Sequence, residues 1–121
     1  MNIKKTLVLG ASEKTERYSN KAIHMLRNHH MPVVAIGNKA GMVKDVSFSK
    51  EQQAFEDVDT VTLYLSAPHQ KEYYDYIISL HPKRIIFNPG TENDELEELA
   101  RQHSIQCLEA CTLVLLSTGQ Y

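Results

Sequence analysis

Five short apolar runs, separated by longer polar segments, recur along the chain. They lie at residues 6–9, 32–36, 58–65, 84–87 and 105–108, and turn-forming glycine, proline or asparagine residues follow most of them. Most of the runs are apolar throughout rather than alternating with polar residues. Such runs are typical of strands that are buried on both faces of a sheet. We therefore expect five strands of a parallel sheet.

The polar segments between these runs carry apolar residues at helical spacing. After Ser19, which can cap a helix, Ala22, Ile23 and Leu26 share one face. Thr91 with Asp94 is similar to a capping box. We expect helices after Ser19, from Pro68 to about Leu80, after Thr91 and from Cys111 to Leu116. A shorter helix is expected near residues 50–54, within a less regular segment.

Regular alternation of strands and helices predicts an α/β protein with a Rossmann-like, three-layer α/β/α architecture. Right-handed crossovers between five strands give 3-2-1-4-5 as the simplest strand order, numbered along the chain. Such a sheet has a crevice at the carboxyl ends of strands 1 and 4, where ligands of this fold bind. One domain, 1–121, accounts for the whole sequence.

Composition narrows the classes of partner. The chain has 121 residues and a formal net charge of −2, which does not favour nucleic acid as a ligand. No apolar run approaches the roughly 20 residues that span a bilayer, and no secretory signal precedes the first strand. Two cysteines are too few for a disulfide framework. A cytoplasmic protein with no membrane or nucleic-acid partner is expected.

The first strand ends in Gly10-Ala11-Ser12, where a dinucleotide-binding fold places its phosphate turn. Only the first glycine of the G-x-G-x-x-G pattern is present, because Ser12 and Thr15 occupy the other two positions. The turn still offers small side chains, backbone N–H groups and one hydroxyl to an anion. The alternative is that Gly10 only ends the strand.

Three cations follow this turn. Lys14 and Arg17 lie in the loop, and Lys21 lies near the start of the next helix. Together with a helix N-terminus they predict a phosphate site. The alternative is an ordinary solvated loop.

The end of the second strand points to the kind of nucleotide. NAD-binding proteins usually have an acidic residue there to bind the ribose hydroxyls. This chain has Gly37-Asn38-Lys39 and no acidic residue before Asp45. A lysine at this place suits a phosphate on the ribose, as in coenzyme A or NADP, and makes NAD the weaker candidate.

The fourth strand ends in Asn88-Pro89-Gly90-Thr91. A turn and a helix cap would explain these residues, but their position opposite Gly10 makes them a candidate wall of the site. No Ser-His-Asp or Cys-His constellation can be identified, and neither the cysteines nor His29-His30 form a metal-binding pattern. The sequence therefore predicts binding, with no evident catalysis and no metal.

Several segments together resemble the small stand-alone CoA-binding domain proteins, which are similar to the nucleotide-binding domain of the succinyl-CoA synthetase α subunit. The resemblance rests on Leu7–Ser12, on Glu16-Arg17-Tyr18-Ser19-Asn20-Lys21-Ala22 and on Asn88-Pro89-Gly90-Thr91-Glu92-Asn93, and it extends to Cys111–Val114. It implies a Rossmann-like fold and a coenzyme A site. The synthetase's catalysis is not implied, since it needs a phosphorylated histidine on a second domain and a partner subunit.

The same resemblance assigns residues to the ligand. It places Gly10, Ala11 and Ser12 along the pyrophosphate and Arg17, Tyr18 and Ser19 beside it. Lys39 would lie near the adenosine phosphate, following Gly37 and Asn38, and Pro89 and Gly90 would face the pantetheine arm. The function expected is binding of coenzyme A or an acyl-CoA. The alternatives are a small NADP-binding oxidoreductase-like protein and a Rossmann-like scaffold that has lost its ligand.

Overall fold

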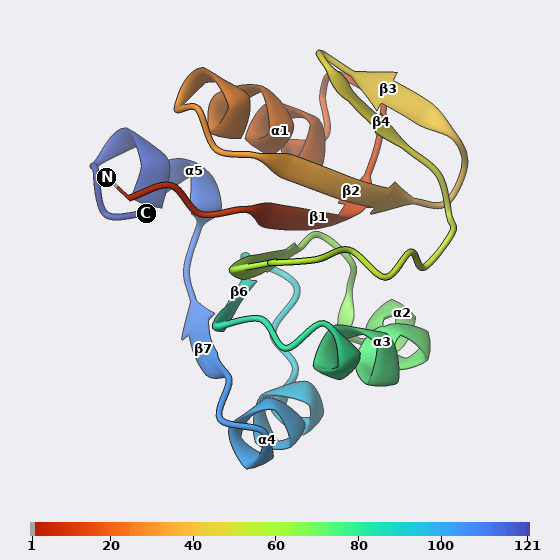
Figure 1. Ribbon diagram of the computed structural model, residues 1–121, viewed down its shortest axis with the longest axis vertical. Coiled ribbons are helices and arrows are strands. Elements are labelled where there is room, and N and C mark those ends of the chain that lie inside the picture. The colour runs from red at the N-terminus through yellow and green to blue at the C-terminus, as the bar shows by residue number, and fades with distance from the viewer. Residues whose placement is uncertain (1) are drawn as a thin grey trace.

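The computed structural model describes residues 2–121 and shows five parallel strands in one sheet (Figure 1). The strands are β1 (Thr6–Ala11), β2 (Val33–Gly37), β5 (Thr60–Leu63), β6 (Arg84–Phe87) and β7 (Gln106–Glu109). A separate antiparallel hairpin follows β2 and consists of β3 (Gly41–Val43) and β4 (Val46–Phe48). The five predicted strands are thus confirmed, each within a few residues of its expected bounds.

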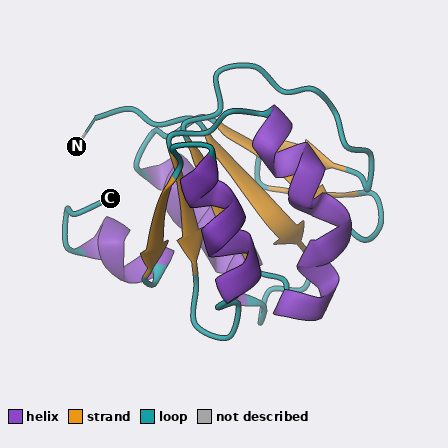
Figure 2. Ribbon diagram, turned by 90° about the horizontal axis from the view of Figure 1, so that it is seen from below, coloured by secondary structure: helices purple, strands orange, loops and turns teal. Residues whose placement is uncertain are grey.

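Helices cover both faces of the sheet (Figure 2). One face packs against α1 (Tyr18–Asn28) and α5 (Thr112–Ser117). The other face packs against α3 (Tyr74–Ser79) and α4 (Asp94–Gln102), and the short α2 (Ala67–Gln70) and a 3-10 turn (Lys71–Tyr73) lead into α3. The three-layer α/β/α architecture is therefore confirmed.

Side chains of the central strand β1 alternate between the two cores. Leu7 and Leu9 pack on the α3 and α4 side, whereas Val8 packs on the α1 and α5 side, and all three are completely buried. Because successive side chains of a strand point to opposite faces, an apolar run fills both cores at once. This explains why the strands lack the alternation of a half-exposed sheet.

The strand order differs from the predicted one. The sheet runs β2-β1-β5-β6-β7, which is 2-1-3-4-5 when its strands are numbered along the chain, instead of 3-2-1-4-5. After the hairpin, the chain returns over the α3 face, where Phe55 and Val58 join the core and Tyr76 donates a hydrogen bond to the Gln53 carbonyl. A right-handed crossover on that face places the next strand on the opposite side of β1 from β2.

Two expected helices differ from the prediction. Residues 50–54 form no helix and are exposed, since they offer no apolar face to the core. The helix expected from Pro68 to Leu80 is divided into α2, the 3-10 turn and α3. The sequence in this region thus keeps its helical character but not a continuous helix.

The helix starts also differ. Helix α1 begins at Tyr18, so Ser19 is buried in the first turn and does not cap the helix. The cap of α4 is Asn93, whose side chain accepts a hydrogen bond from the Leu96 amide, and not Thr91. Thr91 instead donates its hydroxyl hydrogen to the Asn88 carbonyl, which closes the preceding turn.

No helix among residues 2–121 combines the length and the apolar character that crossing a membrane requires.

Candidate functional site: a cleft at the carboxyl edge of the sheet

A cleft of about 510 Å³ opens at the carboxyl ends of β1, β5 and β6. Four loop segments line it, at residues 10–19, 38–39, 64–66 and 89–91. The chain crosses from β1 to β2 over the α1 face of the sheet, and from β2 to β5 over the α3 face. The direction in which strands are added therefore reverses between β1 and β5, and this point is the topological switch point of the sheet. The site expected between strands 1 and 4 is therefore corrected: the third strand, β5, separates them, and the loop after β6 forms the far wall.

The structure brings all but two of the predicted site residues to this cleft. They are Gly10, Ala11, Ser12, Lys14, Arg17, Tyr18, Ser19, Asn38, Lys39, Pro89 and Gly90. Gly37 does not line it but lies behind Ala11, and a Cβ atom added at Gly37 would lie 2.5 Å from the Ala11 carbonyl oxygen. Lys21 does not line the cleft either, and its Nζ lies 5.3 Å from the centroid of the Tyr18 ring.

Because Gly10 has no side chain, backbone atoms form the floor of the cleft at this position. Its φ is +105°, and an added Cβ would lie 3.0 Å from the Tyr64 carbonyl carbon. A side chain here would meet both a strained backbone and a collision with backbone atoms. Glycine therefore lets the end of β1 approach the end of β5, so that the N–H groups of the following turn can face a ligand.

The loop between β1 and α1 is held by its own polar groups. The Lys14 amide donates to the Ser12 hydroxyl oxygen at 3.1 Å, and the Arg17 amide donates to the Lys14 carbonyl at 3.1 Å. From the buried side, the Asn20 side-chain amide donates to the Ser12 carbonyl at 3.0 Å. These bonds fix a loop whose two cations, Lys14 and Arg17, line the cleft.

The N-terminus of α1 faces the cleft without an internal cap. Arg17 occupies the N-cap position and makes no side-chain hydrogen bond to the helix, and the first turn contains no acidic residue. The first amide groups of a helix lack partners within the helix, and the helix dipole favours negative charge at this end. The start of α1 is thus suited to an anion.

The charges of the cleft have one sign. Lys14, Arg17 and Lys39 line it, and none of its lining residues is acidic. The whole chain, in contrast, carries a formal net charge of −2. A ligand with several negative charges fits this distribution.

Sequence reasoning missed the wall after β5, which consists of Tyr64, Leu65 and Ser66. The expected strand order placed this strand at an edge of the sheet, away from the crevice. The sequence does show a break between strand and helix at Ser66-Ala67-Pro68. This break indicates a wall of the cleft only when β5 is known to lie at the centre of the sheet. Burial raises the pKa of the Tyr64 phenol, while the neighbouring Thr112 and Thr62 hydroxyls act in the opposite direction.

A smaller side cavity of about 230 Å³ adjoins the cleft. It is lined by Tyr18, Tyr64, Asn88, Pro89, Cys111 and Leu113, three of which also line the cleft. Cys111 precedes α5 and is a free, partly buried thiol. The side cavity was not predicted, because its walls come from segments far apart in the sequence.

Asn88 forms a rigid part of this wall. Its side-chain amide donates to the Thr62 hydroxyl at 2.7 Å and to the Leu63 carbonyl at 2.8 Å, and its side-chain oxygen accepts from the Thr112 amide at 2.9 Å. The side chain therefore joins β5, β6 and the start of α5. It also explains why this asparagine stands at the end of β6.

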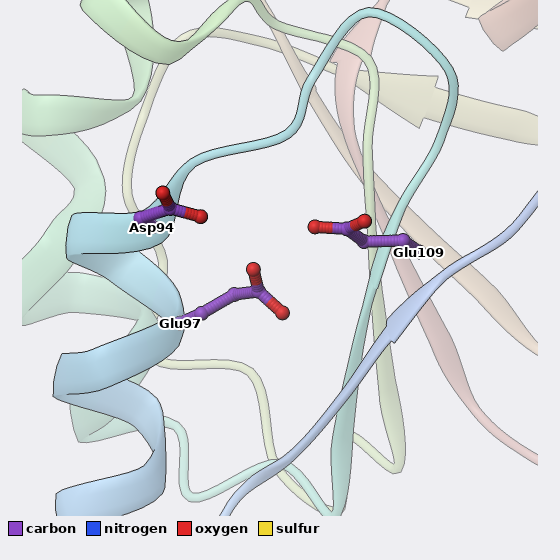
Figure 3. Close-up of side chains that lie close together, drawn as sticks. All are labelled: Asp94, Glu97 and Glu109. Atoms are coloured by element: carbon purple, nitrogen blue, oxygen red, sulfur yellow. The ribbon is translucent and has the colours of Figure 1, made fainter.

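A group of acidic residues lies elsewhere, between α4 and the end of β7. Oxygen atoms of Asp94, Glu97 and Glu109 lie within 4.8 Å of one another (Figure 3). Glu97 is buried, and Arg101 lies 3.8 Å from its carboxylate. Burial, followed by the neighbouring Glu109, raises the pKa of Glu97. No local sequence pattern predicts this group, because Glu109 is distant along the chain from Asp94 and Glu97.

The sequence matches the model of one protein family along almost its entire length. That family is described as "CoA binding domain", and its model matches residues 4–117. No curated protein matches the sequence at a significant level.

Solved structures extend the similarity to the whole fold. A crystal structure described as that of an uncharacterized protein is 45% identical, with a TM-score of 0.97 and 100% of both chains covered. A hypothetical protein from Pyrococcus horikoshii OT3 is 22% identical, with a TM-score of 0.88 over 97% of this chain and 84% of that one. A protein from Thermus thermophilus, described as cell-free ID.343, is 16% identical, with a TM-score of 0.86 over 98% and 91%. The two more distant structures share the fold.

Proposed function

The chain belongs to the CoA-binding domain family, and on this premise we propose that its cleft binds coenzyme A or an acyl-CoA thioester. Coenzyme A carries a pyrophosphate, a phosphate on the ribose and a neutral pantetheine arm that ends in a thiol. A site for it needs cations and backbone N–H groups at one end and apolar walls at the other. The cleft and the side cavity beside it have this composition.

The observation that carries the proposal is the charge of the cleft at the start of α1. Three cationic side chains line it with no acidic residue among them, and the first turn of α1 is uncapped. Each charge-assisted hydrogen bond to a phosphate contributes about 1.5–3 kcal/mol. A ligand with phosphate groups at this place would satisfy the free amides and the cations together.

The residues divide along the proposed ligand. The turn at Gly10, Ala11 and Ser12 and the helix start at Arg17 and Ser19 are assigned to the pyrophosphate, with Tyr18 beside it. Lys39, next to Asn38, is assigned to the ribose phosphate. Pro89 and Gly90 are assigned to the pantetheine arm, and Gly37 supports the turn from behind.

NADP is the second candidate, because a lysine at the place of Lys39 also suits a 2′-phosphate. An oxidoreductase would further need an acid or an orienting group beside the nicotinamide. Among the residues lining the cleft there is no Asp, Glu or His. This composition favours binding over hydride transfer.

Isothermal titration calorimetry with coenzyme A, dephospho-coenzyme A and NADP tests the proposal. We expect Lys39→Ala to weaken coenzyme A binding about tenfold and to leave dephospho-coenzyme A unchanged, because only the former carries the ribose phosphate. Lys50→Ala is the matched control, since Lys50 is exposed and does not line the cleft.

Three results would change the assignment. Equal losses for both forms of coenzyme A would remove Lys39 from the phosphate site. Tighter binding of NADP than of coenzyme A would favour the second candidate. No binding of any of the three ligands would leave a Rossmann-like scaffold without a nucleotide.

A further inference from the structure

The side cavity next to the cleft gives the proposed site a selectivity for the acyl group. We propose that it receives the acyl group of an acyl-CoA thioester, and that the protein prefers short, uncharged acyl groups to both free coenzyme A and acidic acyl groups. This inference rests on the proposed function, because the nucleotide must first occupy the cleft. The six residues that line the side cavity carry the argument.

Continuity with the cleft places the end of the ligand here. Tyr18, Tyr64 and Pro89 line both spaces. A ligand whose phosphates lie at Gly10 and Arg17 and whose arm passes Pro89 would therefore extend into the side cavity. The distal end of the arm is the thiol or its acyl group.

The lining of the side cavity excludes charge. None of its six residues is a Lys, Arg, His, Asp or Glu. The one amide, Asn88, uses both side-chain hydrogens and its oxygen within the protein, so it has no free hydrogen to donate to a ligand. A carboxylate placed here would lose its hydration without gaining a cation, whereas an alkyl group would gain apolar contacts.

The size of the side cavity limits the acyl chain. Its volume is about 230 Å³, less than half of the roughly 510 Å³ of the cleft. Leu113 and Cys111, at the start of α5, form the wall away from the shared residues. Chains of a few carbon atoms fit this space, and long fatty acyl chains exceed it.

Calorimetric titration of the unmodified protein with a series of thioesters tests the selectivity directly. We expect binding to tighten about threefold to fourfold for each added methylene from acetyl-CoA to butyryl-CoA, which is the effect of burying a methylene group. Isovaleryl-CoA and malonyl-CoA form a matched pair, because their acyl groups have nearly the same shape and differ in charge. Isovaleryl-CoA should bind at least tenfold more tightly than malonyl-CoA.

A variant that fills the side cavity tests the location. In Leu113→Phe the larger ring occupies the proposed acyl site, so the preference for butyryl-CoA over coenzyme A should disappear. Val114→Phe is the matched control, because Val114 is the adjacent residue on α5 and is 53% exposed to solvent. Cys111→Leu fills the same space from another position and serves if Leu113→Phe does not fold.

The outcomes separate this inference from the proposed function. If coenzyme A binds and the acyl groups make no difference, the acyl site is wrong and the nucleotide site stands. The same conclusion follows if the preference for butyryl-CoA survives in both cavity-filling variants. If neither coenzyme A nor any thioester binds, the proposed function fails and the acyl site fails with it.

Discussion

The first turns of α1 and α4 are built in opposite ways. In α4, the Asn93 side chain accepts a hydrogen bond from the Leu96 amide, and Asp94, Glu95 and Glu97 supply negative charge to the first turn. In α1, Arg17 stands at the cap position without a side-chain hydrogen bond, and the first turn has no acidic residue. Of these two helices, α1 is the one that begins at the wall of the cleft.

The difference indicates that the start of α4 contributes to the stability of the fold, whereas the start of α1 is suited to binding a ligand. A helix N-terminus has free amides and a partial positive charge, and both are stabilised by a cap and by acidic residues. Helix α4 contains these groups in its own sequence. Helix α1 lacks these groups, which makes its first turn less stable in the free protein. A bound anion would supply the missing partner.

The largest effect is expected when α1 is given the cap it lacks. Asp is a preferred N-cap residue, so Arg17→Asp should stabilise the free protein by about 1 kcal/mol. The same change removes a cation and adds a negative charge beside the proposed pyrophosphate, which should weaken coenzyme A binding about 100-fold. Urea denaturation and calorimetric titration measure the two effects.

Arg17→Ala is the control for this change, because it removes the cation without adding a cap. It should bind coenzyme A more weakly than the unmodified protein and more tightly than Arg17→Asp, with no gain in stability. Unchanged affinity in Arg17→Asp would show that the start of α1 is not the anion site.

A smaller effect, on stability alone, is expected at α4. Asn93→Ala removes the cap and leaves the Gln70 side-chain oxygen and the Tyr74 hydroxyl without their hydrogen-bond donor. Loss of a cap together with buried hydrogen bonds should lower the free energy of unfolding by about 2 kcal/mol. Coenzyme A affinity should not change. A loss of affinity as large as that of Arg17→Ala would contradict the separation of the two helix starts.

The smallest effect is expected from the acidic residues around α4, as a dependence on pH. The pKa of Glu97 is raised by burial and by Glu109, so ionisation of Glu97 is less favourable in the folded protein than in the unfolded chain. Its contribution to stability is therefore lost as the pH rises from about 4 through the raised pKa. Glu97→Gln should remove this loss, so that the melting temperature at pH 7, taken relative to that at pH 4, should be higher than in the unmodified protein. Parallel pH profiles of the two proteins would contradict the raised pKa.

Local sequence was sufficient for the strands and for most of the cleft. The strands lie in short, largely apolar runs, and most of the residues that follow β1, β2 and β6 are found at the cleft. These features depend on a few neighbouring positions, such as Gly10 after Leu9 or Asn88 after Phe87. Their interpretation needed no knowledge of distant contacts.

Strand order and the third wall of the cleft depended on distant contacts. The order is determined by the face over which residues 49–59 return, and this is fixed by Phe55, Val58 and Tyr76 packing in the core. No periodic pattern in that segment indicates the face. Because β5 was expected at an edge, Tyr64, Leu65 and Ser66 could not be assigned to the site. The helix caps were uncertain for another reason, since both Thr91 and Asn93 are residue types that cap helices.

The positive charge of the cleft also affects the rate at which a ligand associates with the protein. The cleft contains three cations while the chain as a whole is negative, so the surface outside the cleft is more negative than the net charge alone indicates. A diffusing anion is repelled by most of the molecule and attracted at one opening, which directs its approach. Dissolved salt weakens both influences over a distance of about 10 Å. The rate of encounter is therefore governed by ionic strength, even for a ligand whose apolar end determines how well it fits.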